Sequence, residues 1–263
     1  MEKLLFVFRY IKYRLKAKTK YGVHSQFIYD FIGNILRDKT KYRDYKVLWA
    51  NRNNLASSNS PIETVDFGVG SGKKAYSTKI IPLGKIVTLR SHKEKELRLL
   101  YKLVNYYKPN NILEFGTAAG ISTSYIKFGN HLSYMVTMEG CANLSANATE
   151  SILKLGIGNI VFEVGNFDTR LQSVLKKFKT LDFVFFDGNH REEPTLSYFN
   201  QCAELSNESS IFVFDDIHWS KGMENAWKTI KNDSRVSITI DLFWFGLVFF
   251  RSGIEKQDFI LHY

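Results

Sequence analysis

One repeating pattern determines the fold class of this chain. From about Asn111 onward, a short apolar run is followed each time by a loop and then by a segment with apolar residues at helical spacing. Such runs occur at Asn111–Phe115, Tyr134–Met138, Ile160–Val164, Leu181–Phe186 and Ile211–Phe214. Strands that alternate with helices in this way form a parallel sheet with helices on its faces. The pattern therefore predicts a doubly wound α/β fold.

The pattern changes after the last helical segment. Val236–Asp241 and Leu247–Arg251 are rich in β-branched and aromatic residues, and only Leu242–Gly246 separates them. A crossover helix does not fit in this space, so the two strands must pair antiparallel. With the five parallel strands they make a mostly parallel seven-stranded sheet, and Phe259–His262 is a candidate for a further edge strand.

The first 110 residues lack this alternation. They read as mainly helical, and the polar stretch Asn51–Ser60 has the composition of a linker or an exposed loop. A helix predicted at His92–Tyr107 leads into the sheet. We therefore expect a mainly helical extension over residues 1–94 and the sheet domain over residues 95–263.

Two glycine-rich segments, Asp66–Gly72 and Ile112–Gly120, compete to be a cofactor loop. Such a loop is informative when a strand precedes it, a helix follows it, and an acidic residue ends the next strand about 20 residues later. The apolar run after the first loop ends at Arg90, whereas the strand after the second ends at Glu139, 23 positions beyond Gly116. The second loop is therefore the predicted site. We interpret the first as a turn, with a lid over the cofactor as the alternative.

The residues of the second loop favour a cationic cofactor. Gly116 and Gly120 let the backbone approach a ligand closely, and Glu139 can accept hydrogen bonds from both hydroxyls of a ribose. A nicotinamide cofactor uses a similar layout, but its fingerprint has three glycines and directs a helix N-terminus at pyrophosphate. Here Ala118-Ala119 occupies the loop and Glu114 precedes it. A carboxylate there would repel pyrophosphate, but it suits the sulfonium and amino groups of S-adenosylmethionine.

Ile112–Gly120 together with Glu139 resembles the first two motifs of class I S-adenosylmethionine-dependent methyltransferases, and the resemblance covers about residues 95–255. It implies a Rossmann-like methyltransferase fold. It also implies that Asn166 holds the edge of the adenine ring and Phe167 its face, although a turn or a helix cap is the alternative for Asn166. The cofactor-binding residues expected on this basis are Glu114, Gly116, Thr117, Gly120, Glu139, Asn166, Phe167 and Asp187.

Acidic residues and histidines follow the fourth and fifth strands. Asp187 with His190, and Asp215 with Asp216, come at the carboxyl edge of the sheet, where open α/β sheets bind ligands. Grouped carboxylates repel unless they are protonated or bridged by a cation, and oxygen ligands suit Mg²⁺ or Ca²⁺. The arrangement resembles metal-dependent small-molecule O-methyltransferases, including the catechol type and the type acting on macrolide sugars.

This second resemblance implies roles for the four residues. Asp187, Asp215 and Asp216 would be metal ligands, with Mg²⁺ as the expected ion, and His190 would be the general base, which makes His190 and Asp187 the candidate catalytic residues. Two alternatives stay open. The aspartate after the fourth strand occurs in metal-free enzymes of this fold, and Asp215 or Asp216 could cap the following helix.

The predicted activity is methyl transfer from S-adenosylmethionine to a hydroxyl of a small-molecule acceptor. One alternative is methylation of RNA or protein, which the basic N-terminus motivates. The absence of an Asn-Pro-Pro-aromatic type loop after the fourth strand disfavours nucleic acid as a partner. Another alternative is a non-catalytic module that binds the cofactor or a membrane surface, and a homo-oligomer is also compatible with the sequence.

The first twenty residues carry much of the positive charge of a chain whose formal net charge is +10. The cations there are Lys3, Arg9, Lys12, Arg14, Lys16, Lys18 and Lys20. Leu4, Phe8, Ile11 and Leu15 form an apolar stripe at helical spacing. We expect this stripe to pack against the protein's own domain while the basic face is solvated. Peripheral membrane contact through this segment is the alternative.

The sequence also indicates a compartment. No apolar stretch approaches the roughly 20 residues that a membrane span needs, and the N-terminus lacks the small-residue cleavage site of a secretory signal. Cys141 and Cys202 have no metal-type spacing, so we expect buried thiols in a reducing compartment. We therefore expect a cytoplasmic protein.

Overall fold

The structure, a computed structural model, describes residues 2–66 and 77–263. The chain forms two compact units. Unit 1 comprises Met1–Arg37 and Leu175–Tyr263, and unit 2 comprises Asp38–Val174. Unit 1 is therefore built from two segments that are distant in sequence, whereas unit 2 is continuous. The domain boundary expected at residue 94 lies inside unit 2 and stays a prediction.

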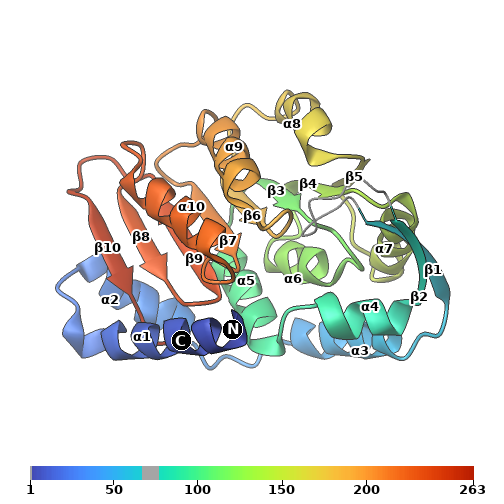
Figure 1. Ribbon diagram of the computed structural model, residues 1–263, viewed down its shortest axis with the longest axis horizontal. Coiled ribbons are helices and arrows are strands. Elements are labelled where there is room, and N and C mark those ends of the chain that lie inside the picture. Colours follow the sequence, from blue (N-terminus) through green and yellow to red (C-terminus); the bar gives the residue numbers. More distant parts are fainter. Residues whose placement is uncertain (1, 67–76) are drawn as a thin grey trace. The chain divides into compact units, whose positions relative to one another are not determined.

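Unit 2 contains the first three strand–helix repeats of the predicted pattern. Its strands are parallel and lie in the order β3-β4-β5 (Figure 1). The elements are β3 (Asn111–Phe115), α6 (Ile121–Gly129), β4 (Tyr134–Glu139), α7 (Ala142–Lys154), β5 (Ile160–Val164) and α8 (Phe167–Leu175). Phe115 pairs with Met138, and Glu139 pairs with Val164. Because the strands are parallel and in register, the loops that follow them meet at one edge of the sheet.

Helices also make up most of the part of unit 2 before this sheet. They are α3 (Asp44–Ala56), α4 (Leu83–Arg90) and α5 (Glu94–Tyr107). The helix predicted at His92–Tyr107 is thus confirmed as α5, but the linker predicted at Asn51–Ser60 is wrong for residues 51–56, which end α3. The physical reason is that Leu48 and Leu55, seven residues apart, share a helix face and pack against one apolar cluster.

The sequence did not predict the hairpin in this part of unit 2. Strands β1 (Pro61–Asp66) and β2 (Ser77–Pro82) pair antiparallel. A glycine-rich segment between antiparallel strands does not have the strand-to-helix context of a cofactor loop, which agrees with rejecting it as the site. The turn and the lid considered for Asp66–Gly72 fall on residues 67–72, which lie outside the described residues.

Unit 1 contains the remaining strands, in the order β10-β8-β9-β7-β6. They are β6 (Phe183–Phe186), β7 (Ile211–Asp215), β8 (Ile238–Asp241), β9 (Phe245–Phe249) and β10 (Gln257–Ile260). Strand β9 is antiparallel to both β7 and β8, as predicted, and the candidate edge strand is confirmed as β10, parallel to β8. In the described part of the chain, β3 to β10 therefore number eight, one more than the seven strands of the predicted sheet.

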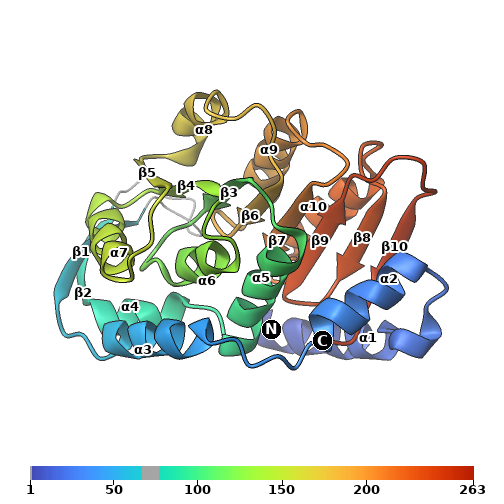
Figure 2. The same cartoon turned by 180° about the vertical axis from the view of Figure 1, so that it is seen from behind.

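Helices cover both faces of the strands in unit 1 (Figures 1 and 2). On one face, the ring centroid of Phe199 on α9 (Glu192–Ala203) lies 6.5 Å from that of Phe212, and α10 (Lys221–Asn232) packs beside α9. On the other face, the ring centroid of Phe27 on α2 (Gln26–Phe31) lies 5.0 Å from that of Phe249. Phe249 pairs with Ile211, so it faces away from Phe212, the next residue along β7. This confirms the doubly wound arrangement for unit 1.

Helix α1 (Glu2–Lys16) packs an aromatic face against unit 1. The rings of Phe6, Tyr10 and Tyr13 lie 5.3, 4.9 and 5.3 Å from the ring of Phe243. Tyr13 is 4% exposed, and its hydroxyl donates a hydrogen bond to the carbonyl oxygen of Leu261. The burial raises the pKa of Tyr13 above its ordinary range. The helix is thus tied to the C-terminal strand region.

The apolar stripe predicted to pack is on the other side of this helix. Phe8, Ile11 and Leu15 are 66%, 50% and 82% exposed. The expectation that this stripe packs against the protein's own domain is therefore wrong. The reason is that the opposite side of the helix packs three aromatic rings around Phe243, and the Tyr13 hydroxyl finds a backbone acceptor there.

Two expectations about environment can be compared with the structure. Cys141 and Cys202 are free and buried, as predicted, and burial raises the pKa of the Cys202 thiol. Within residues 2–66 and 77–263, no helix combines the length and the apolar character that crossing a bilayer requires.

Candidate active site

The loop after β3 has a backbone that few residue types tolerate. Gly116 and Gly120 have φ angles of 98° and 76°, and Ala118 has a φ of 45°. A Cβ atom on Gly120 would lie 3.1 Å from the Cβ of Ala148 on α7, so glycine also lets the loop approach this helix. The N–H of Gly116 donates to the carbonyl of Met138 at 2.9 Å. The loop is thereby fixed against the end of β4.

Glu139 ends β4 beside this loop. Its carboxylate accepts hydrogen bonds from the backbone N–H groups of Ala118 at 2.8 Å and Cys141 at 2.9 Å. Burial raises the pKa of Glu139, while these N–H groups and the charge of Arg90 oppose the rise. The predicted ribose-binding carboxylate is therefore held at the glycine loop in a defined orientation.

The loop after β5 lies next to Glu139. Gly165, with a φ of 137°, donates its N–H to the carbonyl of Glu139 at 2.9 Å. The side-chain oxygen of Asn166 accepts from the N–H of Asp168 at 2.8 Å, which confirms the helix-capping interpretation of Asn166. The ring of Phe167 lies 5.7 Å from that of Phe115 on β3. Contact of Asn166 and Phe167 with adenine stays a prediction, in which the amide NH₂ of Asn166 is the donor.

Glu114 and Thr117 belong to a buried chain of hydrogen bonds behind the glycine loop. Glu114 is fully buried and accepts from the hydroxyls of Thr123 at 2.5 Å and Thr137 at 2.7 Å. The hydroxyls of Thr117 and Thr137 are 2.6 Å apart. These hydrogen bonds connect the glycine loop to α6 and β4. Sequence reasoning missed Thr123 and Thr137, because isolated hydroxyl residues carry no spacing signal.

Unit 2 thus brings together the residues predicted to bind the cofactor, apart from Asp187, which belongs to unit 1. They sit on or directly after β3, β4 and β5. The Thr117 hydroxyl and the Glu114 carboxylate face the interior, whereas Glu139 and the loop after β5 meet at the sheet edge.

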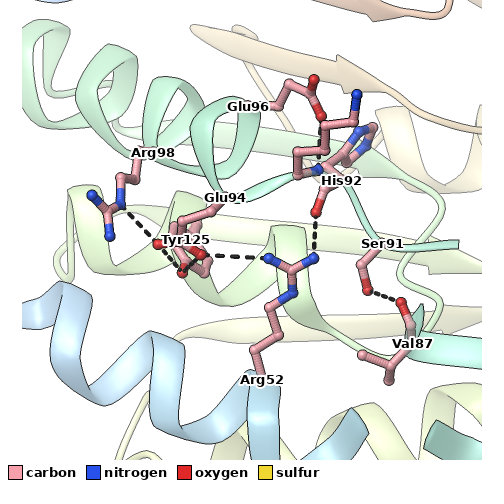
Figure 3. A network of polar contacts seen from close by, with 9 residues as sticks. Arg52, Val87, Ser91, His92, Glu94, Glu96, Arg98 and Tyr125 are labelled. Carbon is pink, nitrogen blue, oxygen red and sulfur yellow. Dashed lines mark hydrogen bonds and ion pairs between the residues drawn. The ribbon is translucent and has the colours of Figure 1, made fainter. Parts of the chain in front are cut away.

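A polar network anchors α6, the helix that leaves the glycine loop (Figure 3). Glu94 of α5 accepts from the hydroxyl of Tyr125 on α6, at 2.8 Å from one oxygen and 3.0 Å from the other. Arg98 donates to Glu94 at 2.8 Å, and Arg52 of α3 lies 3.5 Å from the same carboxylate. Arg52 also donates to the carbonyl of His92 at 2.8 Å. Three helices are therefore joined through Glu94, a position that the sequence did not single out.

In unit 1, the register of β6 and β7 brings the predicted acidic residues together. Phe186 pairs with Phe214, so Asp187 and Asp215 follow at the same level. A carboxylate oxygen of Asp187 lies within 4.8 Å of one from Asp215. Asp215 is 6% exposed, and Asp216 has a φ of 53°, which turns the chain directly after the strand. The structure thus places Asp187 beside Asp215, while the binding of one metal ion by Asp187, Asp215 and Asp216 stays a prediction.

His190 lies in the same cluster. Its Nε2 is 3.7 Å from Oδ1 of Asp187. A ring nitrogen of His190 and one oxygen each from Asp215 and Asp216 also lie within 4.8 Å of one another, close enough to share an ion. His190 is thus positioned as a candidate ligand as well as the predicted base.

His218, three residues after Asp215, points elsewhere. Its Nε2 lies 2.8 Å from Oδ2 of Asp241, and its ring stacks on Phe243 with centroids 5.2 Å apart. The other oxygen of Asp241 accepts from the N–H of Phe243 at 2.8 Å. This pair stabilises the turn between β8 and β9. The spacing from Asp215 to His218 equals that from Asp187 to His190, so spacing alone could not separate the two histidines.

Comparisons with known proteins agree with this geometry. Residues 113–217 match the family model for a methyltransferase domain. A comparison with curated proteins finds no match. The structure resembles an O-methyltransferase from Bacillus cereus in complex with S-adenosylhomocysteine, with a TM-score of 0.55, 17% identity, and coverage of 85% of this chain and 97% of that chain.

Two further solved structures have the same fold. One is the O-methyltransferase TomG from Streptomyces achromogenes, involved in tomaymycin synthesis and solved with S-adenosylmethionine (TM-score 0.54, 19% identity, 62% of this chain and 82% of that chain). The other is the methyltransferase PaMTH1 from Podospora anserina bound to S-adenosylhomocysteine (TM-score 0.56, 15% identity, 62% and 81%). The chain therefore shares the Rossmann-like fold of these solved methyltransferases, and residues 113–217 carry the match to a methyltransferase domain.

Proposed function

We propose that this protein transfers the methyl group of S-adenosylmethionine to a hydroxyl of a small molecule. The observation that carries the proposal is the meeting of the Gly116–Gly120 loop, Glu139 and the Gly165–Phe167 loop at one edge of β3, β4 and β5. Solved neighbours with this fold hold S-adenosylmethionine or its demethylated product, and two are described as O-methyltransferases. These descriptions support a hydroxyl as the acceptor.

Each part of this edge has a role in holding the cofactor. The carboxylate of Glu139 accepts hydrogen bonds from the ribose hydroxyls, and the backbone of the glycine loop approaches the methionine part. The Asn166 amide and the Phe167 ring hold the adenine. Glu114 lies directly behind the loop and favours the cationic sulfonium and ammonium groups over a pyrophosphate.

The acidic cluster of unit 1 serves the acceptor. Asp187, Asp215 and Asp216 supply carboxylate oxygens, the ligand type that fits a hard divalent cation such as Mg²⁺, and the ring of His190 lies beside them. An ion held there would lower the pKa of the acceptor hydroxyl. His190 takes the hydroxyl proton, and the adjacent Asp187 carboxylate stabilises the imidazolium that results. The acceptor oxygen bonds to the methyl carbon as the carbon–sulfur bond breaks, and S-adenosylhomocysteine leaves.

Calorimetry with S-adenosylmethionine and S-adenosylhomocysteine tests the cofactor half of the proposal. Both should bind, and Glu139→Ala should weaken binding by about 1.5–3 kcal/mol, because a charge-assisted contact to the ribose is lost. Glu150→Ala, a fully exposed carboxylate on α7, is the matched control and should leave the affinity unchanged. Equal affinity of Glu139→Ala and wild type would remove Glu139 from the site.

Turnover with a panel of small hydroxylated acceptors, including catechols, tests the second half. Formation of S-adenosylhomocysteine together with a methylated acceptor supports the proposal. Tight cofactor binding with turnover only on RNA or protein, or with no acceptor at all, would contradict it.

A further inference from the structure

Helix α1 presents an apolar stripe outward from unit 1. Phe8, Ile11 and Leu15 are spaced three and four residues apart, so they line one side of the helix, and each is at least half exposed. Phe6 and Tyr13 point to the opposite side and pack against unit 1. Apolar side chains that are exposed together along one line form a contiguous patch, which marks an interaction surface, whereas single exposed apolar residues do not.

Cations flank this stripe on both sides. At about 100° per residue, Lys12 and Lys16 lie along one flank of the stripe and Arg14 along the other. All three side chains are exposed, and so is that of Lys18, which follows the helix. Lysine and arginine next to an apolar surface extend their stems along it and keep the charge at its rim.

The helix is held in place before any partner arrives. Arg9 forms an ion pair with Glu224 of α10 at 3.1 Å, and Tyr13 is bonded to Leu261. Beyond the helix, Lys18 exchanges backbone hydrogen bonds with the end of β10, from its N–H to the carbonyl of Ile260 and from the N–H of His262 to its carbonyl. A preformed helix loses little conformational entropy on docking.

The charge pattern selects among partners. A second copy of this chain docked on the same face would bring like charges together across the contact, and the phosphate backbone of a nucleic acid would leave the apolar stripe against water. An anionic lipid surface matches both features, because its headgroups attract the cations and its acyl boundary takes up the apolar side chains. We propose that α1 binds the surface of a membrane containing anionic lipid, with Phe8, Ile11 and Leu15 inserted below the headgroups and Lys12, Arg14 and Lys16 among them.

Flotation of the full chain with vesicles tests this proposal, and it does not depend on methyl transfer. The protein should float with vesicles of phosphatidylglycerol and phosphatidylcholine, and much less with pure phosphatidylcholine. Binding should weaken as salt is raised, because screening reduces the attraction between the cations and the headgroups.

One double variant and one triple variant, each with a matched control, test whether α1 is the membrane-binding surface. Phe8→Ser with Leu15→Ser should lower the partition coefficient by about tenfold or more, whereas Leu132→Ser with Leu153→Ser, which removes exposed apolar side chains elsewhere, should not. Lys12→Glu, Arg14→Glu and Lys16→Glu together should abolish flotation, whereas Lys85→Glu, Lys176→Glu and Lys179→Glu, with the same net charge and exposed side chains, should retain it. Circular dichroism checks that every variant is folded.

Three results would overturn the proposal. The first is equal flotation of the α1 variants and their controls. The second is a wild type that does not bind vesicles and forms a dimer in light scattering. If Phe8→Ser with Leu15→Ser dissociates that dimer, a second copy covers the stripe. The third is a wild type that does not bind vesicles but binds a generic RNA in a salt-sensitive way, with this binding abolished by the charge reversals at Lys12, Arg14 and Lys16.

Discussion

At the scale of single residues, Lys127 shows how burial links folding to pH. Its side chain is fully buried in unit 2, and its ammonium group donates to the carbonyl of His131 at 3.0 Å and to that of Ser133. Desolvation lowers the pKa of Lys127 to about 8. In the unfolded chain the lysine pKa is about 10.4, so between these values the unfolded state binds more protons than the folded state.

The free energy of unfolding should therefore rise with pH from about 8 to about 10, by roughly 1–3 kcal/mol relative to Lys127→Met. Urea unfolding of wild type and Lys127→Met across this pH range measures both free energies of unfolding. Their difference cancels the contribution of other titrating groups. Lys154→Met, at an exposed position on α7, should follow the wild-type curve. Parallel curves for wild type and Lys127→Met would show that the buried group does not titrate in this range.

The proposed roles of His190 and Asp216 can be tested separately. Chelation of divalent cations should abolish turnover while cofactor affinity stays nearly unchanged, because the ion acts on the acceptor and not on the sulfonium. Asp216→Asn should reproduce the effect of chelation. His190→Ala should keep the ion and lose roughly 10²–10⁴ in rate, the usual contribution of a positioned base.

Metal titration of each variant, together with kcat, distinguishes the two roles. His24→Ala is the matched control and should have wild-type kcat. If His190→Ala lost the ion as Asp216→Asn does, the imidazole would be a ligand, and the hydroxyl would need another base. Full activity in chelator would favour the metal-free version of this site.

At the scale of elements, the hydroxyl of Tyr125 joins α6 to α5. Tyr125 is 1% exposed, and its burial and its bond to Glu94 raise the pKa of Tyr125. Tyr125→Phe should lower the free energy of unfolding by about 1–2 kcal/mol, because Glu94 keeps Arg98 but loses one donor. Tyr21→Phe, at a position 84% exposed, should have little effect.

A double-mutant cycle with Glu94→Ala, which removes the acceptor, isolates this contact. A coupling energy above about 0.5 kcal/mol assigns the effect to the pair. A coupling near zero would mean that Tyr125→Phe acts through packing alone.

The elements also show what the sequence could predict. The strands β3 to β9 and the carboxyl-edge position of Glu139, Asp187 and Asp215 follow from a local alternation of apolar runs, so single-sequence patterns sufficed. The packed face of α1 did not follow, because the helix has two apolar stripes and only tertiary contacts decide between Phe8 and Tyr13. The hairpin of β1 and β2 and the role of Glu94 depend on partners distant in sequence, for which one sequence carries no signal.

At the scale of the whole molecule, the two units differ in how the chain builds them. Unit 2 uses one continuous stretch, residues 38–174, whereas unit 1 joins residues 1–37 to residues 175–263. In unit 1 the first helix meets Phe243 between β8 and β9, and the segment after it pairs with the end of β10. Each of these contacts closes a loop of more than 200 residues, since Tyr13 and Leu261 alone are 248 positions apart.

This interleaving sets an order of events during synthesis on the ribosome. Translation proceeds at about 5–20 residues per second, so α1 emerges roughly ten seconds or more before its partner strands. Through that interval the aromatic face of α1 lacks its native partners, because Phe243 and β10 are synthesised last. The nascent chain thus exposes the aromatic face of α1 for most of its synthesis, and we expect chaperones that bind emerging polypeptides to act on this segment.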